Sequence, residues 1–219
     1  MFSRIHVVGR GRVGGALAAR LAERGVTVTD SDPELVLLCV PDAAIADVAR
    51  ATAPGPWIAH VSGATALAAL DPHVRRFGVH PLQTFTRARG AEQIDGAWAA
   101  ITAEDDDAQS RATGLAEILG LRPFVIADAD RGLYHAGAVI ASNYLVTLYR
   151  AASRLVAAAG APPAALVPLM ERTIENGFDL TGPIARGDVE TIERHLRDID
   201  RAAPDLVAMY RALAAATAP

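Results

Sequence analysis

"VVGRGRVGGALAARLAERG", residues 7–25, joins an apolar run to a helical pattern through a turn rich in glycine. Gly9, Gly11 and Gly14 have the spacing G-x-G-x-x-G. The first glycine permits a tight turn, the second lets the backbone approach a pyrophosphate, and the third lets the helix pack against the strand. The stretch could be only a tight strand-to-helix turn, yet its place between a strand and a helix favours a phosphate-binding site.

Outward from this turn, short apolar runs alternate with helical patterns. The runs are residues 4–8, 35–40, 57–61, 76–79, 97–102 and 123–127, and helices are expected at 12–24 and 107–119. Such alternation is typical of a mostly parallel sheet covered by helices. The sequence therefore predicts an α/β, Rossmann-like domain over residues 1–128.

Beyond Asp130 the strand-like runs stop and long helical patterns follow. We expect helices at about 131–159, 163–180, 188–200 and 204–217, with a loop at 181–188. This predicts an all-helical domain over residues 129–219 that serves substrate binding and dimerisation. Four apolar helices carry more hydrophobic surface than one small sheet can cover, so a homodimer is expected.

Composition excludes several classes of protein. No run reaches the eighteen or so apolar residues of a membrane helix, and no signal-peptide core precedes the glycine turn, so a cytoplasmic protein with no membrane partner is expected. The net charge is −4 and the arginines are spread along the chain, which argues against nucleic acid.

The cysteine and lysine counts restrict the chemistry. Cys39 is the single cysteine and is expected in the core, so neither a disulfide framework nor a cysteine metal site is expected. All 21 basic residues are arginine, which removes mechanisms that need a lysine. The six histidines are then the main groups that can exchange protons near neutral pH.

Small or polar residues follow four successive strands. In open α/β sheets, ligands bind beyond the carboxyl ends of the strands. Each residue also has a simpler reading: Asp42 could cap a helix from Ala43, Ser62 could cap one near Thr65, and Pro81 could end a strand. Those readings leave His80 and Gln83 unexplained. The residues at these ends are Gly9 to Gly11, Asp42, Ser62, Gly63, His80, Gln83 and Thr84.

The first helix of the second half carries a further polar set. His135 and Ser142 are seven residues apart and share a face, and Asn143 lies about 80° round from His135 if the helix is regular. Polar groups on a buried helix must be paired, so the set could be a structural network or part of a site.

The segment before residue 35 is too short for an intact dinucleotide fold. Residues 26–30 read as a strand, but only Ser31 to Glu34 separate them from the next run, fewer than a parallel crossover needs. A strand and helix are therefore missing on the adenosine side. Asp30 lies where a ribose-binding acid would sit, or in the turn. With Asp32 and Glu34 nearby, a 2′-phosphate would be repelled, which favours NAD over NADP.

The chain resembles the Rossmann-like oxidoreductases that end in a helical domain of unknown function, distant relatives of ketopantoate reductase, pyrroline-5-carboxylate reductase and prephenate dehydrogenase. The resemblance spans nearly the whole chain through "GRGRVG", "VPDAAI", "VSGA", "HPLQTF", "YHAGAVIASNY" and "LTGPIARGD". Ketopantoate reductases use a lysine with an asparagine one turn later. Asn143 resembles that asparagine, whereas Val139 takes the place of the lysine. The proton donor is therefore expected to be His80 or His135.

The leading hypothesis is an NAD(P)-dependent oxidoreductase for a small oxo, hydroxy or imino substrate. Its rival is a non-catalytic nucleotide- or metabolite-binding protein that has lost part of the adenosine site. Arg186 could hold a substrate carboxylate or pair with Asp188 at the surface. The expected catalytic residues are His80, His135 and Asn143; the cofactor contacts are Gly9, Arg10, Gly11, Arg12, Val13, Gly14, Asp30, Pro41, Asp42 and Ser62; and the substrate contacts are Gln83, Thr84, Ser142 and Arg186.

Overall fold

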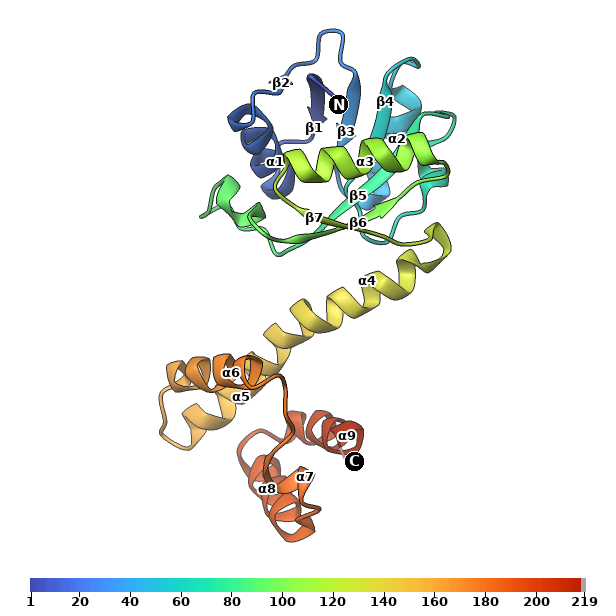
Figure 1. The fold of residues 1–219 in the computed structure, drawn as a ribbon. Coiled ribbons are helices and arrows are strands. Elements are labelled where there is room, and N and C mark those ends of the chain that lie inside the picture. Colours follow the sequence, from blue (N-terminus) through green and yellow to red (C-terminus); the bar gives the residue numbers. More distant parts are fainter. Residues whose placement is uncertain (218–219) are drawn as a thin grey trace. The chain divides into compact units, whose positions relative to one another are not determined.

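The structure is a computed structural model that describes residues 1–217 and divides into two compact units, Met1–Val139 and Ile140–Pro219. The first unit contains the sheet and the second is helical (Figure 1). The predicted fold class, a mostly parallel Rossmann-like sheet followed by an all-helical part, is confirmed. Packing places residues 129–139 with the first unit, whereas the sequence suggested a boundary after residue 128.

One seven-stranded sheet forms the centre of the first unit, with strand order β2-β1-β3-β4-β5-β6-β7. All neighbouring strands are parallel except β5 and β6, which are antiparallel. Each predicted apolar run forms a strand. The strands are β1 (Arg4–Val8), β2 (Thr27–Val28), β3 (Leu35–Leu38), β4 (Trp57–His60), β5 (Arg76–Leu82), β6 (Trp98–Thr102) and β7 (Arg122–Val125).

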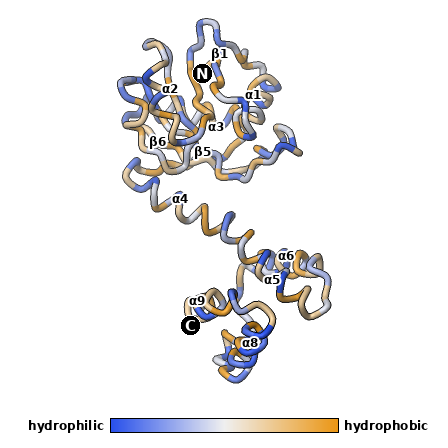
Figure 2. The backbone as a smooth tube through the Cα atoms, turned by 180° about the vertical axis from the view of Figure 1, so that it is seen from behind, coloured by the Kyte–Doolittle hydropathy of each residue, from blue (hydrophilic) through white to orange (hydrophobic). Residues whose placement is uncertain are grey.

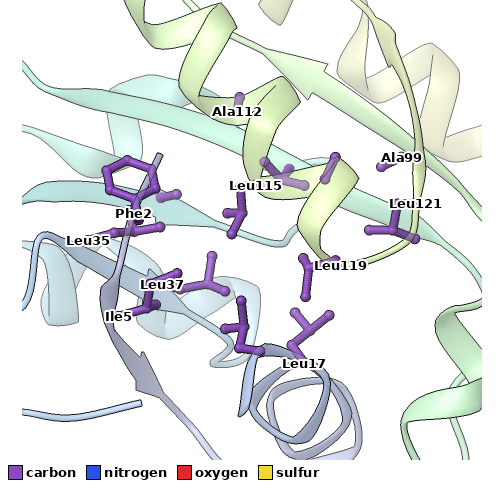
Figure 3. Packing of buried hydrophobic residues seen from close by; sticks show 14 of the residues in the cluster. Phe2, Ile5, Leu17, Leu35, Leu37, Ala99, Ala112, Leu115, Leu119 and Leu121 are labelled. Carbon is purple, nitrogen blue, oxygen red and sulfur yellow. The ribbon is translucent and has the colours of Figure 1, made fainter. Parts of the chain in front are cut away.

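Helices cover both faces of this sheet. The helices that pack on the sheet are α1 (Arg12–Glu23), α2 (Ile45–Ala51) and α3 (Asp106–Ile118). Helix α4 (Arg131–Val139) follows β7, and the short 3-10 turns are η1 (Asp42–Ala44), η2 (Leu67–Leu70), η3 (Ala91–Ile94) and η4 (Asp128–Asp130). Successive residues of β3 point to opposite faces. Leu35 and Leu37 pack with Leu17 of α1 and Leu115 of α3, as Figure 3 shows.

The other face has a smaller core, in which Val36 and Leu38 of β3 pack with Ile45 of α2 and Leu70 of η2. All four residues of β3 are therefore buried. This explains the continuous apolar run in the sequence, which is typical of a central parallel strand.

The short connection before β3 is confirmed. β2 and β3 both lie parallel to β1, on its two sides, because Val28 pairs with Ile5 and so does Leu35. Residues 29–34 alone make this link, without a helix. The adenosine side therefore lacks the strand and helix that a complete dinucleotide fold would place there.

Two of the acids in this link are bound at the start of β1. Arg4 donates from Nε to the Asp32 carbonyl oxygen at 2.8 Å and forms an ion pair with the Asp32 carboxylate at 3.2 Å. The Ser3 backbone N–H donates to Glu34 at 2.6 Å, and this bond lowers the pKa of that carboxyl. Both acids lie at the start of β1, whereas ligands of such sheets bind beyond the carboxyl ends of the strands, so the sequence-based argument for NAD keeps only Asp30.

The second unit begins with a π-helical turn, η5 (Ile140–Tyr144). Its other elements are α5 (Leu145–Ala158), η6 (Pro163–Ala165), α6 (Leu166–Glu175), α7 (Gly182–Ala185), α8 (Val189–Ala202), η7 (Pro204–Leu206) and α9 (Val207–Thr217). Its core contains Ala151, Ile199, Ala203 and Leu206. None of the helices within residues 1–217 is long and apolar enough to cross a membrane.

The helical prediction was wrong in two details. Helix α6 ends at Glu175 instead of continuing to residue 180, because Gly177 takes a φ of +71° and its N–H bonds to the Ile174 carbonyl oxygen at 3.0 Å, a left-handed helix ending. The expected loop at 181–188 contains the short helix α7, with Pro183 in its first turn, where proline needs no backbone partner.

Candidate active site

The glycine turn contains two glycines that the fold itself requires. Gly9 has a φ of +92°, and a Cβ there would lie 2.6 Å from the Cys39 carbonyl oxygen. A Cβ at Gly14 would lie 1.9 Å from the Gly9 carbonyl oxygen, so α1 could not pack so closely against the turn. Packing alone therefore accounts for both residues.

Gly11 has no such explanation within the protein. Its φ of −70° is open to every residue, and a Cβ there would have no atom of residues 1–217 within 4 Å. Gly11 is the N-cap of α1, and its position offers no side-chain oxygen to the first-turn N–H groups. A helix N-terminus with open space in front of it suits an anion such as a pyrophosphate.

The residues around Gly11 leave the turn accessible. Arg10 and Arg12 are exposed and Val13 is half-buried. Beneath the turn, burial raises the pKa of the Cys39 thiol to about 12, while the nearby Arg10 cation opposes the shift. Cys39 packs against the main core, as expected, and stays a neutral thiol.

The carboxyl ends of β3 and β4 lie next along the edge. Pro41 and Asp42 are exposed after β3, and the N-cap of η1 is Pro41, so Asp42 is the first residue inside this turn and does not stand at a cap position. After β4, Ser62 Oγ accepts from the Thr65 N–H at 3.0 Å within a local turn, so that hydroxyl has a structural role. The capping alternative is therefore wrong for Asp42, and Ser62 closes a turn instead of starting a helix.

His80 lies inside β5, where it pairs with Ala100, and not after the strand as the sequence suggested. The antiparallel partner β6 extends β5 through Pro81 to Leu82. His80 is half-buried, and its Nδ1 lies 2.7 Å from the Tyr134 hydroxyl oxygen. Its ring meets that of Tyr134 edge to face, with centroids 5.5 Å apart.

His135 completes this cluster from the next position on α4. Its ring centroid lies 5.9 Å from that of His80. Gly63 lies against both rings, because a Cβ there would lie 2.4 Å from His135 Nδ1 and 3.0 Å from His80 Nε2. The structure thus brings His80 and His135 together at the edge formed by β4 and β5, and glycine at position 63 makes the room.

A buried cation lies beneath the two histidines. Arg131, the first residue of α4, is 1% exposed and donates from NH1 to the Thr102 hydroxyl at 2.7 Å and from NH2 to the Ser62 carbonyl oxygen. It also lies against Gly78, where a Cβ would come within 2.9 Å of NH1. Burial lowers the pKa of Arg131, and Asp128 is the main group that opposes the shift.

Burial keeps the His80 ring and the Tyr134 phenol neutral. Burial first, then the neighbouring His135 and Arg131, lowers the pKa of His80 to about 4, while Asp42 opposes the change. Burial raises the pKa of Tyr134 to about 12. Near neutral pH, His80 is therefore an imidazole and Tyr134 a phenol. The site can donate and accept hydrogen bonds, but His80 carries no positive charge.

The comparisons with known proteins agree with this architecture. Residues 97–217 match the family model described as "Domain of unknown function (DUF2520)", which is more than half of the chain. The chain belongs to this family. A search of curated protein sequences found no match.

Solved structures share the fold of this DUF2520 protein. A protein from Bacteroides fragilis, provisionally named an NADP oxidoreductase, is 20% identical over 98% of this chain and 97% of its own, with a TM-score of 0.82. A protein from Thermotoga maritima, whose name gives no activity, is 25% identical over 97% of this chain and 96% of its own, with a TM-score of 0.77. An imine reductase from Streptomyces aurantiacus is 17% identical over 98% of this chain and 93% of its own, with a TM-score of 0.69.

The remaining predicted site residues of the DUF2520 chain follow β5, follow β2 or belong to the second unit. Gln83 and Thr84 are exposed after β5, and Gln83 Oε1 accepts from the Thr84 N–H at 2.8 Å. Asp30 is exposed two residues beyond the end of β2. Their ligand contacts stay predictions.

Ser142 and Asn143 lie in the π-helical turn of the second unit, where the Ser142 hydroxyl donates to Asn143 Oδ1 at 3.0 Å. The predicted 80° between His135 and Asn143 assumed a regular helix and does not hold through a π turn. Arg186 is exposed at the end of α7, and the Asp188 carboxylate accepts from the Thr191 N–H at 3.0 Å to cap α8. The roles of all three site candidates stay predictions.

Sequence reasoning missed Tyr134, Arg131 and His60, which is buried next to Arg131. The signal for two of them was present: in "RGLYHAG" Arg131, Tyr134 and His135 fall at i, i+3 and i+4, one face of a helix. Within residues 1–217, no group of three or more His, Cys, Asp or Glu side chains is arranged to hold a metal ion.

Proposed function

We propose that this chain is an NAD(P)-dependent oxidoreductase that acts on a small oxo, hydroxy or imino substrate. The observation that carries the proposal is Gly11, whose missing side chain is explained neither by backbone conformation nor by packing. Its place at the start of α1, after β1, is where a pyrophosphate lies in dinucleotide folds. The fold shared with the named oxidoreductases supports the same reading.

The residues along the edge fit a nicotinamide cofactor. The turn from Gly9 to Gly14 would hold the pyrophosphate, and Asp42, Ser62 and Gly63 would border the nicotinamide. A bound nicotinamide would supply or accept the hydride. His80 and His135 would exchange the accompanying proton with the substrate, because they are the titratable groups that meet beside Gly63. In this proposal NAD and NADP are both open, with Asp30 the remaining reason to favour NAD.

A titration with NADH and with NADPH, followed by nicotinamide fluorescence, tests the proposal. Gly11→Leu should fold normally, because its side chain enters open space, and should weaken binding at least tenfold. Gly114→Leu is the matched control, since a Cβ at Gly114 in α3 also meets no described atom within 4 Å. No binding of either nucleotide at millimolar concentration would contradict the proposal, whereas tight binding without turnover would favour a non-catalytic binding protein.

A further inference from the structure

Tyr134 orients the His80 ring. Its hydroxyl lies 2.7 Å from Nδ1, and the Cε1–Nε2 edge of the ring faces Gly63 beyond the end of β4. A phenol that donates to Nδ1 leaves the ring proton on Nε2, because a neutral imidazole carries one proton only. Phe124 packs edge to face on Tyr134 at 5.9 Å and supports the ring from β7.

Arg131 fixes the start of α4 and brings a positive charge under the ring. Its guanidinium joins the Ser62 carbonyl at the end of β4 to the Thr102 hydroxyl at the end of β6. Both partners are uncharged, and the carboxylates that offset its charge are Asp128 of η4 and Asp42 of η1. Tyr134 and His135 follow one turn later on the same helix, so Arg131 also sets where they meet the sheet.

We propose, resting on the oxidoreductase function above, that Tyr134 and Arg131 are positioning residues. They hold His80 as a neutral imidazole with Nε2–H directed at the edge beside Gly63, and this selects a neutral carbonyl substrate over a protonated imine.

The selection follows from hydrogen bonding and charge. A carbonyl oxygen accepts a bond from Nε2–H, whereas a protonated imine has no lone pair to accept it. The positive charge of that imine would also be repelled by Arg131, which is poorly screened because it is buried. The groups that face His80 are Tyr134, His135 and Arg131 from α4, His60 from β4 and Asp42 from η1.

The proton step then leaves His80 neutral. As the carbonyl carbon accepts the hydride that a bound nicotinamide would supply, its oxygen takes the proton from Nε2, and the Tyr134 hydroxyl proton passes to Nδ1. One N–H and one O–H bond break, and one O–H and one N–H bond form. The resulting phenolate lies near the Arg131 cation. The Nδ1 proton then returns to the phenolate oxygen while water supplies a new proton to Nε2 and leaves as hydroxide, which restores both groups. This route explains how a histidine that is uncharged at neutral pH can serve as a donor.

Nitrogen NMR of the histidine rings in the protein without nucleotide tests the state of His80. The His80 signal, assigned from its loss in His80→Gln, should show one tautomer with the proton on Nε2 and no protonation down to pH 5. Tyr134→Phe should give a mixture of tautomers. Arg131→Met should move the His80 titration toward higher pH, and Arg131→Lys should restore it. A wild-type His80 that titrates near pH 6.5, or carries its proton on Nδ1, would overturn the proposal.

Turnover tests the selection. Oxidation of NADH or NADPH should be at least tenfold faster in kcat/KM with the neutral ketone cyclohexanone than with 2-methyl-1-pyrroline. Faster reduction of the imine would overturn the selection. If neither nucleotide binds, the oxidoreductase function fails, while the NMR result still decides the state of His80.

Discussion

At the scale of single residues, His80 and His135 are the predicted groups for proton exchange, because their rings meet beside Gly63. Replacing either by Gln should lower turnover by roughly 10² to 10⁴ and leave nucleotide affinity within a fewfold of wild type, since neither ring belongs to the glycine turn. The measurement is kcat with a reduced probe substrate, beside a fluorescence titration. Full activity in both variants would show that the mechanism is wrong.

His60 is a second residue with a measurable consequence. It is 0% exposed at the end of β4, and within the described residues neither ring nitrogen has a hydrogen-bond partner. Burial, aided by the Arg131 cation, lowers the pKa of His60 to about 3. The pKa of a histidine in an unfolded chain is about 6.5, so the unfolded chain binds a proton at this residue more readily than the folded protein. The contribution of neutral His60 to the free energy of unfolding is therefore fully present above pH 6.5 and is lost as the pH falls toward 3.

We therefore predict that His60→Leu is less sensitive to acid than the wild type. His60 alone should cost the wild type about 2 kcal/mol of unfolding free energy between pH 7 and pH 5. Trp57 and Trp98 both lie in the first unit, so guanidinium unfolding followed by tryptophan fluorescence reports on it. His195→Leu, in the second unit, is the control. An equal loss in wild type and His60→Leu would contradict the assignment.

The glycine turn could be predicted from the sequence because its residues are close together in the chain and so are also close in space. The partners of His80 could not be predicted in this way. Tyr134 lies 54 positions further along the chain, and only the fold brings its hydroxyl to Nδ1. Asp42 shows the reverse case: its position fitted a helix cap, yet the chain enters a 3-10 turn one residue earlier, with Pro41 as the N-cap and Asp42 as the first residue of the turn.

At the scale of elements, the link over residues 29–34 has a consequence for binding. It is attached to the start of β1 through Arg4 and Ser3, whereas the glycine turn follows the other end of that strand. The adenosine half of a dinucleotide should therefore gain little from this protein. We predict that NADH binds no more than about tenfold tighter than reduced nicotinamide mononucleotide, a difference of about 1.4 kcal/mol.

Competition titrations with the two compounds measure this ratio, and AMP should compete weakly. A preference for NADH above a thousandfold would show that another part of the protein recognises adenosine. The sequence could indicate this short link because chain length sets a hard limit on a crossover. The sequence could not predict where β5 ends, because the end depends on pairing with β6. It also could not predict the π turn, because residue patterns do not distinguish a π turn from a regular helix.

At the scale of the whole molecule, the α/β half was predictable because burial on two faces leaves continuous apolar runs, as in β3. The helix ends and the arrangement of the helices in the helical half were less predictable. Its pattern gives helices, but the ends depend on single residues such as Gly177, and its arrangement depends on which apolar faces find partners.

The second unit carries an apolar surface that its own small core does not cover. Leu169 and Ile174 of α6 are 62% and 54% exposed, and Phe178, just beyond that helix, is 71% exposed. Figure 2 shows hydrophobic residues along α5 and α6, whereas hydrophilic residues prevail on α8. A surface of this kind is typical of a site that another protein chain covers.

We predict that this surface forms a symmetric homodimer, because a second copy of the chain supplies a matching apolar surface. Light scattering at micromolar concentration should give twice the chain mass of 22.9 kDa. Phe178→Asp should shift the protein toward the monomer, because it places a charge in a desolvated interface. Val74→Asp, at an equally apolar position that is 87% exposed on the first unit, is the matched control and should stay dimeric. A monomeric wild type, or a Phe178→Asp variant that dimerises as well as the control, would show that this surface has another role.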